Sequence, residues 1–195
     1  MKYQANTADE QLIHFFLNGD PNAMATLVAL YKDRIYTSIY ALVQDKYQAE
    51  EIFQAVFIKV IDNMMAGKTV EEGKFLPWAM RIAHGLCIEH TRKLTQSTNT
   101  VVKEAGSEAA TETAGFAVPA VAPSINTFES HDKIRNMIDM LPEQQREVIV
   151  LNHYAGLGFK EIADIMKCSL NNALETMRFG LLNLRKLMIE KEMSI

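Results

Sequence analysis

The C-terminal part of this chain has the sequence pattern of short helices joined by tight turns. This pattern limits the possible folds of the chain more than any other feature. The pattern runs from Leu141 to Leu187. Pro142 is suited to the first position of a helix, where its missing N–H costs nothing. A mainly apolar rhythm of 3.6 residues follows, carried by Val148, Ile149, Leu151 and Asn152. We therefore predict that a helix opens this segment.

Two turns divide the rest of the segment. After the break Gly156–Leu157–Gly158, a short amphipathic helix follows whose apolar face holds Phe159, Ile162, Ala163 and Met166. Lys167–Cys168–Ser169 then forms a tight turn, and the Ser169 hydroxyl is placed to cap the next helix. Two short helices joined by a turn of about three residues form a helix-turn-helix, which places its second helix in the major groove of DNA. The presence of this motif decides between two interpretations of the chain, a DNA-binding regulator and an ordinary helical bundle.

Residues 8–93 are predicted to form four helices. The first covers Asp9–Asn18, and the second runs from Pro21, with Asp20 as its cap, to about Val43. Asp45–Gln48 resembles a capping box for the third helix. Its buried positions are predicted to be Ala49, Ile52, Phe53, Val56, Phe57, Val60, Ile61 and Met64. After the polar loop Ala66–Lys74, the last helix starts near Pro77 and ends near Lys93.

Residues 94–130 lose this periodicity and hold one Lys against four Glu, which indicates a flexible acidic linker. The helical pattern resumes at about Ser130. The sequence thus predicts an all-α fold of two small helical domains joined by a flexible linker: a four-helix N-terminal domain, 8–93, and a C-terminal helix-turn-helix domain, 131–190. We expect no strand in either domain and no core shared between them.

Composition excludes several functional classes. The chain is 48% hydrophobic and 23% charged, which is typical of globular proteins. No apolar run is long enough to cross a bilayer, and the N-terminus lacks the apolar core of a signal peptide, so we expect a cytoplasmic protein with no membrane insertion. Cys87 and Cys168 are expected to be reduced, partly buried thiols. No residues have the spacing of a metal, cofactor or catalytic site, so we do not expect an enzyme.

Several stretches in both halves fall at the spacing of one protein family. In the first half they are the Gly19–Asp20 turn, the AEEIFQAVF segment around Gln54, and the segment KFLPWAMRIAHGLCIEHTRK. In the second half they are Leu141–Pro142, Gln145–Arg146–Glu147, Glu161–Ile162–Ala163 and Ser169. In this order they resemble the RNA polymerase sigma factors of the sigma-70 superfamily, extracytoplasmic-function (ECF) type. The resemblance covers most of the chain.

This resemblance implies a protein that binds core RNA polymerase and promoter DNA, directs transcription initiation, and is bound by an anti-sigma factor or other regulator. In such a protein the third helix docks on the polymerase. The polymerase-binding residues implied here are Glu50, Glu51, Gln54 and Asp62. The alternative interpretation is that these four residues are simply solvated helix positions.

The loop before Trp78 and the helix after it resemble the reader of the −10 promoter element. The implied residues are Phe75, Trp78, Arg81, His84, Arg92 and Lys93. Aromatic faces stack on a base that has left the duplex, and cations neutralise phosphates. Alternatively, Phe75 and Trp78 are core residues, and Arg92 and Lys93 complement a helix dipole.

The helix after the capping serine corresponds to the reader of the −35 element, and the implied residues are Ser169, Asn171, Asn172, Thr176 and Arg178. Asn pairs bidentately with adenine and Arg with guanine. Residues 132–195, however, hold nine cations against nine anions, and three apolar residues lie among the DNA-facing positions: Leu174, Phe179 and Leu182. We expect these three to be covered by the first domain, a regulator or a second copy of the chain, or to turn into the core of their own domain.

Two functions therefore remain open from the sequence. The first is a sigma factor that directs core polymerase to promoters. The second is a degenerate sigma-like protein that keeps partner binding but has lost autonomous promoter recognition, because the recognition helix carries an apolar stripe that suits a protein–protein groove.

Overall fold

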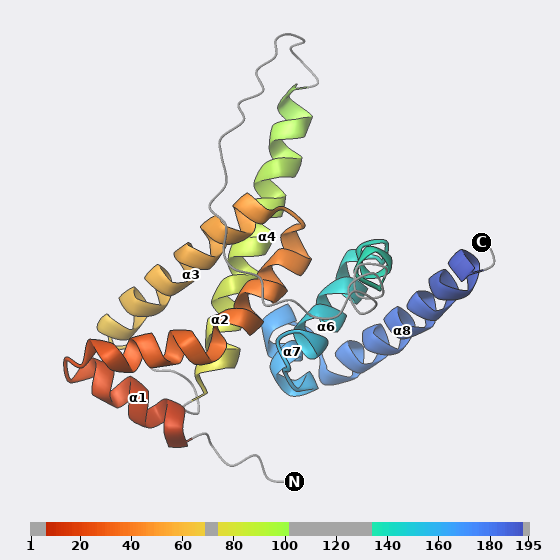
Figure 1. The fold of residues 1–195 in the computed structure, drawn as a ribbon. Helices are drawn as coiled ribbons and strands as arrows, with labels where there is room; N and C mark the ends of the chain where they lie inside the picture. The colour runs from red at the N-terminus through yellow and green to blue at the C-terminus, as the bar shows by residue number, and fades with distance from the viewer. Residues whose placement is uncertain (1–6, 69–73, 102–133, 193–195) are drawn as a thin grey trace.

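The computed structural model describes residues 7–68, 74–101 and 134–192, and every regular element within these ranges is a helix (Figure 1). A short helical segment over residues 134–139 precedes α6. The labelled helices are α1 (Thr7–Leu17), α2 (Pro21–Val43), α3 (Lys46–Met65), α4 (Phe75–Val101), α6 (Glu143–His153), α7 (Phe159–Met166) and α8 (Leu170–Glu192). The prediction of an all-α fold with two small helical domains is confirmed.

Helix starts in the first domain follow the predicted caps. The Asp20 carboxylate accepts a hydrogen bond from the backbone N–H of Asn22 at 2.9 Å, and Pro21 opens α2. The Asp45 carboxylate accepts one from the backbone N–H of Gln48 at 2.8 Å and caps α3. These short side chains satisfy N–H groups that have no partner inside the helix.

The last helix of the first domain is longer than expected at both ends. α4 begins at Phe75, so Pro77 sits in its first turn, where proline is tolerated. It continues to Val101, past the expected boundary at residue 93, so the first residues assigned to the linker are helical. Extending an existing helix is much easier than starting one. The rest of the predicted linker lies outside the described residues.

Asp9 ties three helices of the N-terminal domain together. Its side chain is buried, and both carboxylate oxygens accept a hydrogen bond from the Tyr31 hydroxyl of α2, at 2.7 and 2.9 Å. The same carboxylate accepts a hydrogen bond from the backbone N–H of Phe75, the first residue of α4, at 3.3 Å. α1 therefore supplies the cap of α4, and this contact fixes where α4 begins.

Helices α6, α7 and α8 form the helix-turn-helix domain. Pro142 lies at the N-cap of α6, one position before the predicted one. Gly156 has a φ of +69°, a left-handed conformation that favours glycine, in the turn between α6 and α7. α8 lies across α6, and Gly180 marks the close approach of the two helices. A Cβ atom at that position would lie 3.0 Å from Ile149 Cδ1 and 3.3 Å from Gln145 Cβ.

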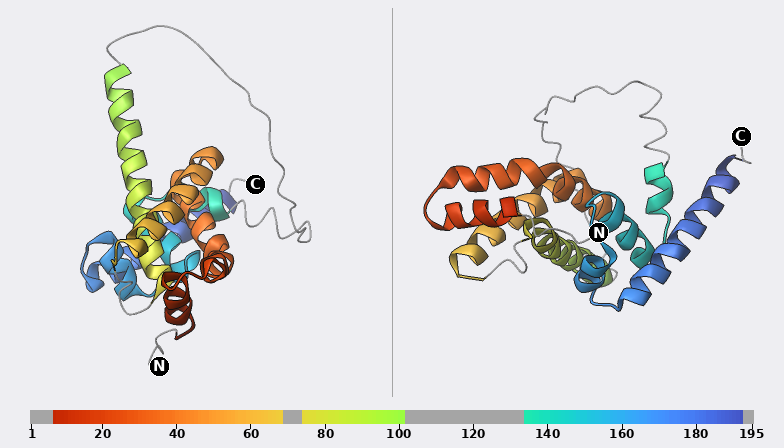
Figure 2. Two further views of the ribbon diagram at one scale, coloured as in Figure 1. Left: turned by 90° about the vertical axis from the view of Figure 1, so that its left-hand side faces the viewer. Right: turned by 90° about the horizontal axis from the view of Figure 1, so that it is seen from below.

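The two domains pack against each other (Figure 2), and their buried residues form one continuous cluster. α2 contacts α6, and α4 contacts α7. The expectation that no core is shared between the domains was therefore wrong. The sequence pattern showed which face of each helix is apolar, but it carried no information on which of these faces meet across the long connection.

The close packing at Gly180 leads to a stability prediction. Gly180→Val is expected to lower the free energy of unfolding by about 1–3 kcal/mol, because the added carbons meet Ile149 and Gln145. Gly85, also helical, has open space around its Cα, so Gly85→Ala is the matched control and should stabilise the chain by roughly 0.5–1 kcal/mol. Thermal unfolding followed by circular dichroism measures both. A Gly180→Val protein as stable as the parent would contradict the close approach.

Candidate protein and nucleic-acid interfaces

All four predicted polymerase-binding residues lie exposed on α3, on the side away from α2 and α4. Successive residues of an α-helix are turned by about 100°, so Glu51, Gln54 and Asp62 share one face, and Glu50 lies at its edge. Val56 and Val60 on the opposite side are fully buried. The structure thus brings three of the four residues into one accessible stripe.

The same face of α3 carries apolar residues that the sequence reasoning did not identify as functional. Ile58 is 60% exposed and Met65 is 71% exposed, although both are large and hydrophobic. Ile58 lies one turn beyond Gln54, and Met65 lies two turns further on. The signal in the sequence was that these residues fall outside the apolar stripe that packs on the core. An exposed apolar pair among polar residues is typical of a protein-binding surface.

Phe75 is a core residue, so the expectation that it stacks on a base was wrong. Its side chain is fully buried and stacks on Tyr31, with ring centroids 5.5 Å apart. Trp78 is half-buried, and its ring meets Phe75 edge-on at 6.4 Å. Of the two predicted aromatic platforms, only Trp78 therefore has an accessible surface.

Three of the predicted basic residues of α4 are exposed: Arg81, Arg92 and Lys93. Lys93 Nζ lies 2.8 Å from Glu89 Oε1, and the hydrogen bond and charge of Lys93 lower the pKa of Glu89. The charge of Lys93 is thus partly offset on its own helix. Arg81, Arg92 and Lys93 therefore all remain candidates for phosphate contacts.

His84, in contrast, is turned away from solvent and faces the second domain. Its Nε2 lies 3.5 Å from Glu147 Oε2 of α6, and both side chains are nearly buried. The expectation that His84 contacts DNA is therefore not met in this structure. α6 covers it, and no local sequence pattern indicates this contact between domains.

The predicted −35 residues surround the start of α8. The backbone N–H of Asn172 donates to Ser169 Oγ at 3.1 Å, so the predicted cap is confirmed. Thr176 Oγ1 donates to Asn172 Oδ1 at 3.4 Å. Asn171 and Arg178 are seven residues apart and share one exposed side, whereas Asn172 and Thr176 lie on another. Ser169 therefore caps α8 by accepting a hydrogen bond from the backbone of that helix. Asn171 and Arg178 lie on the same side, so they can contact the same DNA surface together.

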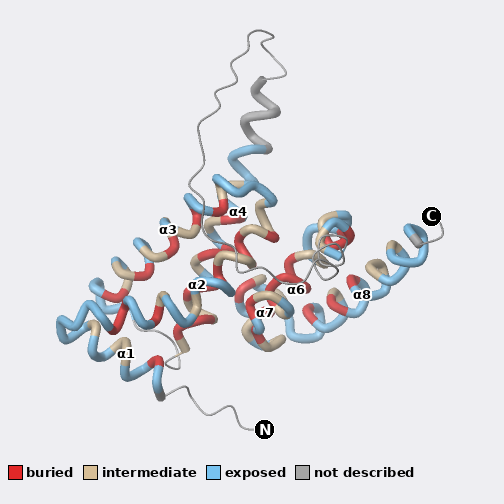
Figure 3. The backbone as a smooth tube through the Cα atoms, viewed as in Figure 1, coloured by how far each residue is buried: buried red, intermediate tan, exposed pale blue. Residues whose placement is uncertain are grey.

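Exposed positions run along much of α8 (Figure 3), and the apolar residues at the predicted −35 positions are among them. Leu174, Phe179 and Leu182 are between 43% and 56% exposed, so the prediction that the first domain or their own core would cover them was wrong. The inward face of α8 is formed by other residues, among them Ala173, Met177 and Gly180. Phe179 also lines a groove of about 340 Å³ between α8 and the start of α6.

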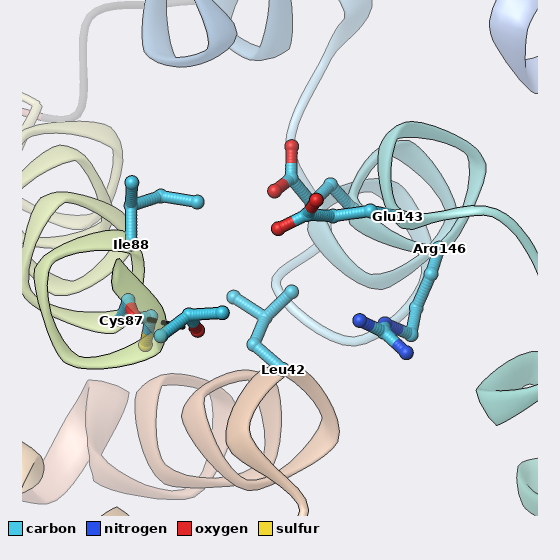
Figure 4. A pocket seen from close by; sticks show the side chains of 7 residues that line it. Leu42, Cys87, Ile88, Glu143 and Arg146 are labelled. Carbon is cyan, nitrogen blue, oxygen red and sulfur yellow. Dashed lines mark hydrogen bonds between the residues drawn. The ribbon is translucent and has the colours of Figure 1, made fainter. Parts of the chain in front are cut away.

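A small cavity lies where α2, α4 and α6 meet (Figure 4). It has a volume of about 10 Å³ and is lined by Leu42, Cys87, Ile88, Thr91, Glu143, Arg146 and Glu147. Two buried polar atoms at this junction lack a hydrogen-bond partner within the described part of the chain: His84 Nε2 and Arg146 Nε. Burial, and then the charge of Glu147, raise the pKa of the Cys87 thiol to about 12.

This environment predicts that Cys87 resists alkylation. At pH 8 a thiol with a pKa near 12 is almost entirely protonated, and only the thiolate reacts rapidly. We therefore expect iodoacetamide to modify the half-buried Cys168 well before Cys87, as read by peptide mass spectrometry. Both cysteines should react at similar rates in denaturant. Equal rates in the native protein would contradict the burial of Cys87.

The described residues contain no cluster of three or more His, Cys, Asp or Glu side chains arranged to hold a metal ion. None of the helices described is both long and apolar enough to cross a membrane.

Comparison with known families matches both halves of the chain. Residues 27–97 match the family described as Sigma-70 region 2, and residues 131–174 match Sigma-70, region 4. Region 2 spans most of α2, α3 and most of α4, and region 4 covers the helix-turn-helix up to Leu174. These two regions in this order define an RNA polymerase sigma factor.

Proteins of similar sequence narrow the class of RNA polymerase sigma factors to one family. The ECF RNA polymerase sigma factor SigW of Bacillus subtilis is 31% identical over 170 residues, covering 86% of this chain and 90% of that protein. SigK of Mycolicibacterium vanbaalenii is 27% identical over 167 residues, covering 86% and 82%. The chain belongs to the ECF RNA polymerase sigma factors, and its function is promoter recognition in transcription initiation.

Solved structures share the fold. The sigma factor RpoE in complex with the anti-sigma factor NepR from Bartonella quintana gives a TM-score of 0.65 at 15% identity, covering 85% of this chain and 96% of that one. CnrH in complex with the cytosolic domain of CnrY also gives a TM-score of 0.65 at 15% identity, covering 94% and 98%.

Proposed function

We propose that this sigma factor binds core RNA polymerase through the exposed face of α3 and reads promoter DNA through α4 and α8. The observation that carries the proposal is the stripe on α3 in which Ile58 and Met65 lie exposed among Glu51, Gln54 and Asp62. In a protein interface, apolar residues supply binding energy when a partner buries them, and the polar residues around them fix the orientation of that partner. The membership of the chain in the ECF family supports RNA polymerase as that partner.

At the −10 element, the contact surface proposed is Trp78 with Arg81, Arg92 and Lys93. The accessible part of the half-buried Trp78 ring is proposed to stack on an unpaired base, and the cations lie along the same helix to meet phosphates. His84 joins this set only when the second domain leaves α4.

At the −35 element, Asn171 and Arg178 are proposed to read base edges, with Asn172 and Thr176 as neighbouring polar contacts. Ser169 and the first N–H groups of α8 would face the phosphate backbone, which is the usual place for anions at a helix start. Each bidentate pair contributes about 1–3 kcal/mol to discrimination between bases.

A regulator of the anti-sigma type is the proposed partner for the apolar residues of α8. Leu174, Phe179 and Leu182 remain uncovered within the described residues, and one similar solved structure shows the sigma factor RpoE in complex with the anti-sigma factor NepR. We further propose that the chain has no catalytic chemistry of its own and acts in the cytoplasm, because its proposed partners are polymerase and chromosomal DNA.

One observation favours a second candidate, a sigma-like protein that binds partners without recognising promoters alone. Leu174 and Leu182 flank Arg178 on the exposed side of α8, where a DNA reader would carry polar residues. In this case polymerase binding would persist, but promoter selection would depend on another protein.

Co-purification and run-off transcription separate these candidates. The purified chain is incubated with core polymerase, tested for complex formation, and then supplied with genomic promoter fragments. Specific transcripts support the sigma factor, whereas a complex without transcripts supports the second candidate. Charge reversal at Glu51 and Asp62 combined with Gln54→Ala should reduce recovery of the complex, and unchanged recovery would refute the α3 site.

A further inference from the structure

Two glycines lie inside the described helices, and packing within the chain explains only one of them. At Gly180 an added Cβ atom would lie 3.0 Å from Ile149 Cδ1, so the packing of α8 on α6 favours a residue without a side chain. At Gly85 of α4 an added Cβ atom would meet no atom within 4 Å. A glycine inside a helix costs roughly 0.5–1 kcal/mol relative to alanine. No contact within the described part of the chain requires this glycine.

Gly85 lies at the centre of the exposed side of α4. Met80 and Ala83 are fully buried, and the turn of about 100° per residue places them on the opposite side of the helix. Trp78 and Arg92 each lie seven residues from Gly85, which is almost two full turns. Trp78, Gly85 and Arg92 therefore form a line along the exposed side of α4, and the middle position of this line has no side chain.

Arginines stand on both sides of Gly85 along this line. Arg81 lies one turn before Gly85, about 6 Å along the helix axis, and Arg92 lies about 10.5 Å after it. Both arginines are exposed. The carboxylate of Glu89, at the edge of the same side, lies 2.8 Å from Lys93 Nζ, so its charge is balanced on its own helix. The surface around Gly85 is therefore open and suited to an anionic chain.

We propose that the sugar–phosphate backbone of unpaired promoter DNA lies directly against α4 at Gly85, between phosphates held by Arg81 and Arg92. The inference rests on the proposed reading of the −10 element by α4, and it names the position where the strand comes closest to the helix. Glycine permits this approach because it has no Cβ atom to hold a ligand away from the helix backbone. Trp78 stacks on a base of the same strand, about 10.5 Å along the helix from Gly85.

The test adds carbon atoms at Gly85 in the full-length chain, which is then assembled with core polymerase. The probe is a fluorescently labelled single strand of mixed sequence, about 20 nucleotides long, because contacts to the DNA backbone do not depend on sequence. Gly85→Ala should lower the affinity roughly threefold and Gly85→Leu roughly tenfold or more, because the added carbons lift the strand from the helix. Both variants should be at least as stable as the parent, since alanine and leucine favour helices more than glycine does. Weaker binding by a more stable protein separates a contact with DNA from a folding defect.

Ala29→Leu is the matched control for the added bulk. Ala29 is exposed on α2, outside the surfaces proposed for polymerase and DNA, so this variant places a leucine at another exposed helical position of the same domain. Its affinity for the single strand should equal that of the parent. Full affinity in Gly85→Leu would overturn the proposal, and so would equal losses in Gly85→Leu and Ala29→Leu. A parent complex that binds the strand no more tightly than core polymerase alone would also overturn it.

A double-mutant cycle with Arg92→Ala tests whether Gly85 and Arg92 act on the same strand. Arg92→Ala alone should weaken binding and make the log–log salt slope shallower by about 0.7, the value for one phosphate of a single strand. Once Gly85→Leu has lifted the strand, loss of the arginine should matter less. The loss of affinity in the double variant should therefore fall short of the product of the two single losses by roughly threefold or more. Losses that simply multiply would show that the leucine acts away from the DNA, and would overturn the proposal.

These outcomes are distinct from failure of the proposed function. Run-off transcription from promoter fragments tests the function, whereas the strand of mixed sequence tests the contact at Gly85. If Gly85→Leu loses affinity as expected but no form of the protein starts transcription, the contact stands and the proposed function fails. If the parent starts transcription and Gly85→Leu binds the strand as tightly as the parent, the function stands and the contact is refuted.

Discussion

Replacing Ile58 with arginine is expected to weaken binding to core RNA polymerase by roughly 30- to 1000-fold, which corresponds to about 2–4 kcal/mol. Ile58 is 60% exposed at the centre of the α3 face, so the substitution removes an apolar contact and introduces a charge into it. Because the side chain is already in water, the fold should be unaffected. Titration of labelled polymerase, with circular dichroism as a check of folding, measures both effects.

Leu30→Arg is the matched control for this prediction. Leu30 is 57% exposed on α2, in the same domain but outside the α3 face. This variant should bind polymerase with the affinity of the parent. Equal weakening in the two variants would mean that surface charge, rather than the α3 face, controls binding, and full affinity in both would exclude Ile58 from the interface.

Arg178→Ala is expected to lower initiation at promoters that depend on a −35 element by roughly 5- to 150-fold. The C-terminal domain holds equal numbers of cations and anions, so a single arginine on the reading face contributes a large part of its attraction for DNA. The salt dependence of promoter binding should also become shallower, by about 0.9 in the log–log slope for each phosphate that is no longer neutralised. In vitro transcription across a salt series measures both effects.

Arg185→Ala provides the comparison on the same helix. Arg185 lies seven residues after Arg178, on the same exposed side of α8 but two turns further from its start. Its removal should have a much smaller effect on initiation. If the two variants were equally impaired, general electrostatic attraction would explain the result, and specific reading by Arg178 would be excluded.

Local chemistry explains which parts of the fold were predictable from the sequence. Asp20, Asp45 and Ser169 each cap the helix that follows, and the structure confirms all three as acceptors of a backbone N–H. Capping depends on residues within three positions of each other. The apolar stripe of α3 was equally readable, since Val56 and Val60 are fully buried at the predicted spacing.

Contacts between distant segments explain why other predictions were wrong. The sequence pattern places Phe75 at DNA, but it packs on Tyr31, which lies 44 positions earlier. It places His84 at the same interface, but His84 meets Glu147 of the other domain. Residue type and spacing describe a helix face, whereas the partner of that face depends on how the helices pack. The same reason applies to the exposed apolar residues of α8.

The buried carboxylate of Asp9 has a consequence for how the chain folds during its synthesis. It accepts the first backbone N–H of α4 across 66 positions of sequence, so this contact closes a long loop. Such non-local contacts form late, because loop-closure entropy must be overcome first. As the ribosome extends the chain, α1, α2 and α3 leave the exit tunnel before their partner α4. The N-terminal domain therefore completes its fold only after Phe75 and the turns beyond it have emerged, and until then the Asp9 carboxylate lacks the backbone N–H of Phe75.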